Sequence, residues 1–166
     1  MLVEFSIWFL LNKNTNNHIV VSYFCNGIFI KDSTTKAVIY KDNISHNINQ
    51  IKKLVSDKTK ICVAVKADGY GTSALETARV CEENGIDMLA IARVSEGIEL
   101  RKNGIKLPLL LLSLCSPNEF EDLFQNNIIP FIFGIDHIHS LDSAAQEYCL
   151  KKNIPNDYRF DVHLAV

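Results

Sequence analysis

The residue best suited to chemistry in this 166-residue chain is Lys66, which follows a short apolar run at residues 61–65. The run is rich in β-branched side chains and therefore predicts a buried strand. Residues 69–71, Gly-Tyr-Gly, predict a tight turn, and a helical pattern begins near Ser73. Lys66 is therefore expected at the carboxyl end of a buried strand, where α/β folds bind their ligands.

Lys66 has two interpretations. A lysine is ordinarily a solvated surface charge, and strand ends are often wet. A lysine held against an apolar strand instead loses hydration, which disfavours the ammonium form and leaves an amine that can attack a carbonyl carbon. Enzymes that use pyridoxal phosphate hold such a lysine. Tyr70, four residues later, is either a turn aromatic that packs on the next helix or a phenol beside the same site.

Composition and charge narrow the class of protein. The chain is 48% hydrophobic and 22% charged, which is typical of a globular core, and its net charge of −2 gives no electrostatic pull toward nucleic acid or an anionic membrane. The five cysteines include no C-x-x-C pair, so we expect free thiols in a reducing cytoplasm. The apolar run at residues 5–11 is far shorter than the ~20 residues that span a bilayer. His137 and His139 lie on different faces of an expected helix, so no metal site is expected.

Strand-like and helical patterns alternate from residue 36 onward. Strands are expected at residues 37–40, 61–65, 88–92, 109–112, 128–133 and 160–166. Asp42, Ser95 and Asp136 are expected to cap the amino ends of the helices between them. The alternation predicts right-handed βαβ units and a parallel sheet. The five strands from residue 61 onward fit an open doubly wound sheet or part of an eight-stranded barrel, and no G-x-G-x-x-G follows any of them to support a dinucleotide site.

Residues 64–71, A-V-K-A-D-G-Y-G, resemble the cofactor-lysine motif of the alanine racemase family, whose usual form is A-V-V/I-K-A-N/D-A-Y-G-H-G. Further segments resemble other parts of the same domain in order and spacing, namely residues 36–49, 78–85, 89–97, 101–113 and 162–166. The resemblance therefore selects the barrel. It implies an α/β fold, a partial TIM (β/α)8-type barrel with about five parallel strands and intervening helices.

The resemblance divides the chain into two regions. Residues 36–166 are expected to be an incomplete N-terminal barrel domain that binds pyridoxal 5′-phosphate, and residues 1–35 an arm that does not match the family. Within the arm, residues 19–24 and 28–30 predict a hairpin around Asn26-Gly27. A closed barrel typically needs ~250 residues, so we expect a truncated domain that leaves two sheet edges unpaired and is inactive alone.

By resemblance, the function is that of a pyridoxal-phosphate-dependent amino-acid racemase, which interconverts L- and D-alanine and supplies D-alanine for peptidoglycan. Lys66 is the residue implied to hold the cofactor and to act as the catalytic acid or base, and Tyr70 the residue implied to help bind the cofactor phosphate. The expected partners are a small amino-acid substrate and a second copy of the chain, in the cytoplasm. Two positions depart from the family, since its His-Gly pair is Thr72-Ser73 here and Ala165 stands where many members carry a lysine.

Two alternative functions stay open. The chain could be a non-catalytic remnant, or a fragment that binds pyridoxal phosphate without racemising a substrate. It could also belong to another pyridoxal phosphate barrel, such as an amino-acid decarboxylase or a carrier of the cofactor. The Lys-Ala-Asp-Gly-Tyr-Gly sequence at residues 66–71 favours the racemase over both of these barrels, whereas the choice between alanine and serine as substrate is not encoded in these residues.

Overall fold

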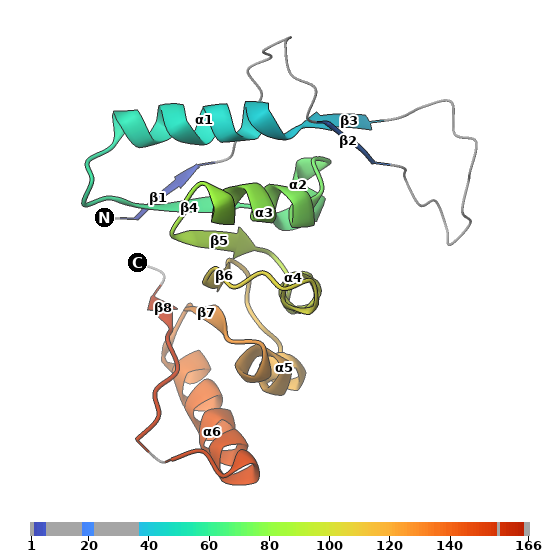
Figure 1. Ribbon diagram of the computed structural model, residues 1–166. Coiled ribbons are helices and arrows are strands. Elements are labelled where there is room, and N and C mark those ends of the chain that lie inside the picture. Colours follow the sequence, from blue (N-terminus) through green and yellow to red (C-terminus); the bar gives the residue numbers. More distant parts are fainter. Residues whose placement is uncertain (1, 6–17, 22–36, 156, 165–166) are drawn as a thin grey trace.

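The computed structural model describes residues 2–5, 18–21, 37–155 and 157–164 (Figure 1). Its centre is a six-stranded sheet in the order β1-β4-β5-β6-β7-β8, in which every pair of neighbouring strands is parallel. The strands are β1 (Leu2–Phe5), β4 (Lys60–Ala64), β5 (Met88–Ile91), β6 (Leu109–Leu111), β7 (Ile128–Ile132) and β8 (His163–Leu164). β4 to β8 are the five parallel strands that the sequence predicts, and they form a curled half of a TIM-type barrel.

Helices connect the successive strands. The helical elements are α1 (Lys41–Leu54), α2 (Lys66–Tyr70), α3 (Ala74–Glu83), α4 (Val94–Lys102), the short 3-10 helix η1 (Pro117–Glu119), α5 (Phe120–Gln125) and α6 (Ile135–Lys152). Each parallel pair from β4 onward is thus joined through a helix, as the right-handed crossover rule requires. In the described part of the chain, every helix is too short or too polar to cross a bilayer.

The strands bury two different faces because successive side chains point to opposite sides of a sheet. On β4, Ile61, Val63 and Val65 pack with the helices in the main core. Cys62 and Ala64 point the other way and join a smaller apolar cluster with Ala90 and Leu110. This second cluster lines the inner face of the half-barrel, where the side chains of a closed barrel meet.

The amino-terminal arm contributes a strand that the sequence did not predict. β1 pairs in parallel with β4, with Leu2 opposite Lys60 and Phe5 opposite Val63, so the lysine strand is not the edge of the sheet as we expected. A second, two-stranded sheet pairs β2 (His18–Val21) with β3 (Ala37–Tyr40) in antiparallel fashion. The predicted hairpin partner of β2, residues 28–30, lies outside the described residues.

Candidate functional site

Lys66 lies at the carboxyl edge of the sheet, as predicted. The ladder between β4 and β5 extends to Val65, whose N–H donates to Ala90 O at 2.9 Å, and Lys66 follows as the first residue of α2. Its side chain is partly buried. Within the described residues, the Lys66 ammonium forms no hydrogen bond or ion pair. Lys66 therefore follows the carboxyl end of β4, and no described carboxylate is bound to its ammonium group.

The backbone after Lys66 is left-handed over five consecutive residues, from Ala67 to Gly71, whose φ is 89°. Ala67 has φ 52° and ψ 49°, Asp68 has φ 51° and ψ 44°, Gly69 has φ 62° and ψ 28°, and Tyr70 has φ 55°. The left-handed region costs a residue other than glycine roughly 1–2 kcal/mol, so this turn stores strain directly beside the lysine. The sequence predicted a turn at residues 69–71; the turn begins two residues earlier.

Hydrogen bonds within the turn hold it in this conformation. The Gly69 N–H donates to Val65 O at 2.9 Å, and the Gly71 N–H donates to Asp68 O at 3.1 Å. The Asp68 carboxylate accepts from the Ala74 N–H at 2.9 Å, at the start of α3. The acid closest to Lys66 in sequence is thus bound to backbone. The strained conformation persists because the surrounding contacts determine it from several sides.

Glu96 ties the lysine turn to the neighbouring strand. Its Oε1 accepts from the Ala67 N–H at 2.9 Å, and its Oε2 accepts from the N–H groups of Ala92 at 2.8 Å and Arg93 at 3.2 Å. One carboxylate therefore joins the tip of β4 to the tip of β5 and caps the amino end of α4. We expected Ser95 to cap this helix. The helix instead begins at Val94, and the Glu96 side chain binds the N–H of the preceding residue, Arg93.

Tyr70, the second predicted site residue, ends the same turn. Tyr70 is 53% exposed, so about half of the residue is in contact with solvent. Tyr70 also borders a small cavity of about 30 Å³ between the turn and α1, which Asn43 and Asn47 line from the helix side. Lys66 and Tyr70 therefore lie at opposite ends of one five-residue element.

Four cysteines lie in the described part of the chain. Cys62, Cys81, Cys115 and Cys149 are buried and are not joined in disulfides. Burial raises the pKa of both Cys81 and Cys115 to about 12, with smaller contributions from Cys62 and Glu82 at the first thiol and from Glu119 at the second. These two thiols are protonated at neutral pH and therefore poorly nucleophilic. Among the described residues, no group of three or more His, Cys, Asp or Glu side chains could hold a metal ion.

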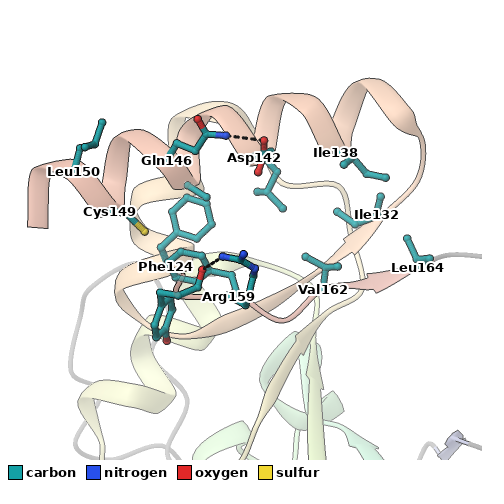
Figure 2. A pocket seen from close by; sticks show the side chains of 14 residues that line it. Phe124, Ile132, Ile138, Asp142, Gln146, Cys149, Leu150, Arg159, Val162 and Leu164 are labelled. Atoms are coloured by element: carbon teal, nitrogen blue, oxygen red, sulfur yellow. Dashed lines mark hydrogen bonds between the residues drawn. The ribbon is translucent and has the colours of Figure 1, made fainter. Parts of the chain in front are cut away.

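The larger cavity, about 720 Å³, lies far along the sheet from Lys66, between α6, β8 and the segment that joins them (Figure 2). Its walls are mainly apolar, and several of them are open to solvent: Leu150 is 72% exposed and Leu164 is 58% exposed. Its polar groups pair with near neighbours, as Asp142 does with Gln146 at 2.8 Å. Neither Lys66 nor Tyr70 is among the described residues that line this groove.

The half-barrel of parallel βα units, with a lysine at a strand end, places this protein in the class of TIM-type α/β barrels. Comparison with known proteins names the family. Residues 39–166 match the family model described as alanine racemase, N-terminal domain. The chain therefore belongs to the alanine racemase family.

Individual relatives agree with the family model. The alanine racemase of Treponema denticola is 38% identical over 113 residues, which are 68% of this chain and 30% of that protein. The serine/alanine racemase of Enterococcus gallinarum is 41% identical over 61% of this chain and 14% of its own length. The structure of alanine racemase from Clostridium difficile 630 superposes with a TM-score of 0.63 at 40% identity and covers 64% of this chain and 28% of that one. The chain thus spans about 30% or less of these relatives.

Proposed function

We propose that this chain is the cofactor-lysine part of a pyridoxal-phosphate-dependent racemase that acts on alanine. The observation that carries the proposal is Lys66, partly buried, free of described partners and placed where the strands end. A lysine with no carboxylate partner fits an aldehyde cofactor, because no ion pair has to break before the amine reacts. Membership of the alanine racemase family supports both the cofactor and the reaction.

Each residue of the site has a separate part in this proposal. Lys66 Nζ would hold the cofactor and would move a proton to or from the α-carbon of the amino acid on one face. The Tyr70 hydroxyl would donate a hydrogen bond to the cofactor phosphate. Glu96 keeps the backbone at Ala67 in place, and so fixes where the lysine side chain starts. The bound cofactor supplies the electron sink that makes the α-hydrogen acidic.

The rest of the proposal follows the family. We propose a small amino-acid substrate, a homodimeric and cytoplasmic enzyme, and a role in D-alanine supply. The domain division proposed from the sequence is retained, with residues 1–35 as an arm and residues 36–166 as the barrel portion. Since the chain spans about 30% or less of its relatives, groups that complete the site in the proposed enzyme lie outside the residues described.

Cofactor capture is tested by reductive labelling. The purified chain is mixed with pyridoxal phosphate, reduced with borohydride and digested, and the modified lysine is located by mass spectrometry. Lys66 should carry most of the label, and Lys66→Ala should lose it. Lys60→Ala is the matched control, because Lys60 is an exposed lysine at the other end of the same strand. Equal labelling of Lys60 and Lys66 would contradict the proposal.

Serine is the second candidate substrate, because the serine/alanine racemase of Enterococcus gallinarum is 41% identical to this chain over 101 residues. In deuterated water, a racemase incorporates deuterium at the α-carbon while it inverts the amino acid. Incubation of L-alanine and L-serine in parallel, followed by chiral separation, distinguishes the two substrates. Labelling of Lys66 with no exchange in either amino acid would instead support a fragment that binds the cofactor without turnover.

A further inference from the structure

The cavity beneath the left-handed turn has mainly apolar walls, including Ile44, Val63 and Ala64, into which a few polar side chains are set. It measures about 30 Å³ and lies between α1 and the turn, with Asn43 and Asn47 on one side and Tyr70, Thr72 and Thr77 on the other. Among the described residues that line it, none carries a formal charge. A void of this size accommodates one or two water molecules, since each requires roughly 10–15 Å³ by a comparable measure.

Two buried amide groups at this cavity lack partners. Asn43 is 3% exposed and Asn47 is 9% exposed, and they lie one turn apart on the same face of α1. Within the described part of the chain, Asn43 Nδ2 and Asn47 Oδ1 form no hydrogen bond. The first is a donor and the second an acceptor. Buried amides are almost always satisfied by protein or by ordered water, so the cavity requires an occupant that can both accept and donate.

The opposite wall connects the cavity to the turn. The Thr72 hydroxyl donates to Gly69 O at 2.6 Å and lies 3.0 Å from the Thr77 hydroxyl. Hydroxyl oxygens retain accepting capacity after one such bond, so this wall offers further partners to a small polar occupant. A cation would need carboxylate ligands and a buried anion would need positive charge, and the described residues that line the cavity supply neither.

We propose that this cavity binds one or two ordered water molecules, which bridge Asn43 Nδ2 and Asn47 Oδ1 and connect α1 to the turn that follows Lys66. The water supports the turn from the α1 side, whereas Glu96 holds it from the side of β5. This hydration site depends only on the fold, so it stands whether or not Lys66 captures a cofactor.

The direct test detects the water in the intact chain. Water-selective NMR on ¹⁵N-labelled protein should give cross-peaks between water and the Asn43 side-chain amide with the sign that marks a long residence time. The exposed amide of Asn49, on the same helix, is the internal control and should show only the short residence of surface hydration. A folded chain whose Asn43 amide behaves like that of Asn49 would overturn the proposal.

Variants test the link to the turn. Asn47→Leu keeps the number and branching of side-chain atoms and removes the acceptor, so it should abolish the long-lived water signal at Asn43. It should also speed hydrogen exchange of the Gly71 and Thr72 amides by about tenfold relative to Asn49→Leu, which has the same effect on helix propensity. If Asn47→Leu does not fold, Asn47→Ser, which keeps an acceptor but shifts it, serves in its place. Unchanged exchange in a variant that has lost the water signal would show that the water does not support the turn.

Discussion

The two ends of the half-barrel are held in different ways. At the amino ends of the strands, side chains form hydrogen bonds with the backbone of the loops. Arg101, for example, donates to the carbonyls of Ile105, Leu107, Asn126 and Asn127 at 2.8–3.2 Å. At the carboxyl end, a strained turn carries a lysine with no described partner. The amino end therefore combines loops with charged side chains that bind their backbone, whereas the carboxyl end carries backbone strain directly beside Lys66.

Other contacts at the amino end follow the same pattern. The Glu82 carboxylate accepts from the N–H groups of Lys106 at 2.6 Å and Leu107 at 3.1 Å, just before β6. Asp87 accepts from the Ile61 N–H at 2.8 Å, at the start of β4. Lys52 donates to the carbonyls of Asn84 and Gly85. Each of these side chains binds backbone that no ladder or helix satisfies, which is what fixes loops between elements.

The largest expected effect on stability is at the amino end. Arg101→Ala leaves four carbonyls without their charged donor and should lower the free energy of unfolding by about 3 kcal/mol, as measured by urea denaturation. Under native conditions the reductive labelling of Lys66 should not change. Arg93→Ala, which removes an exposed arginine near the other end of α4, is the control and should change stability little. A loss of labelling in folded Arg101→Ala would contradict the division between the two ends.

Glu96→Gln should have a smaller effect on stability and a larger one on the site. The glutamine oxygen can accept from one side only, and its amide nitrogen then faces an N–H donor, so the loss should be about 1–2 kcal/mol. The turn at Ala67 should loosen, and the labelling rate of Lys66 should fall. Glu99→Gln changes an exposed carboxylate on the same helix and is the matched control. Equal labelling rates in the two variants would show that Glu96 only caps α4.

Because of the strain beside Lys66, an alanine-to-glycine substitution should change the free energy of unfolding in opposite directions at Ala67 and at Ala144. Ala67→Gly should raise the free energy of unfolding by about 0.5–1 kcal/mol, because glycine adopts the left-handed region without penalty. Ala144→Gly, inside α6, should lower it by about 1 kcal/mol or more, because glycine is a poor helix residue. Both values come from chemical denaturation of the two variants in parallel. Destabilisation by Ala67→Gly would mean that the turn is not strained.

The smallest expected effect belongs to the exposed ion pair between Glu121 of α5 and Lys151 of α6, at 2.9 Å. A hydrogen bond and the charge of Lys151 lower the pKa of the Glu121 carboxyl, and the same bond raises the pKa of Lys151. The lowered carboxyl pKa means that the contribution is present at neutral pH and is lost as the pH falls through that lowered value. The raised pKa of Lys151 means that the contribution of the pair to stability is also lost as the pH rises through the raised pKa of the ammonium group.

Because the pair is exposed, Lys151→Gln should shift the melting midpoint only slightly at neutral pH and not at all in strong acid. Thermal melts of the original chain and the variant across the acid range measure this. A difference that persists in strong acid would show that the change acts through something other than the pair.

Local sequence predicted much of the sheet and the position of Lys66, because short apolar runs bounded by turn residues are typical of buried parallel strands. The runs at residues 61–65 and 109–112 correspond closely to β4 and β6. The strand expected at residues 160–166 is shorter, with β8 covering His163–Leu164 of the described part. The helix caps were predicted less well. Tyr40, not Asp42, occupies the N-cap position of α1, and Asp42 lies in its first turn. At α4, Glu96 takes the role expected of Ser95.

The amino-acid sequence by itself determined the alternation of strands and helices and placed a lysine at a strand end, because both depend on side chains close together in the chain. Only the tertiary structure decided that β1 joins β4, that Glu96 reaches the Ala67 N–H, and that Asn43 and Asn47 face the turn with unpaired amide atoms. These features depend on residues 20 or more positions apart, for which local pattern carries no signal. Their energies arise when the folded chain brings a donor, an acceptor or a sheet edge to its distant partner.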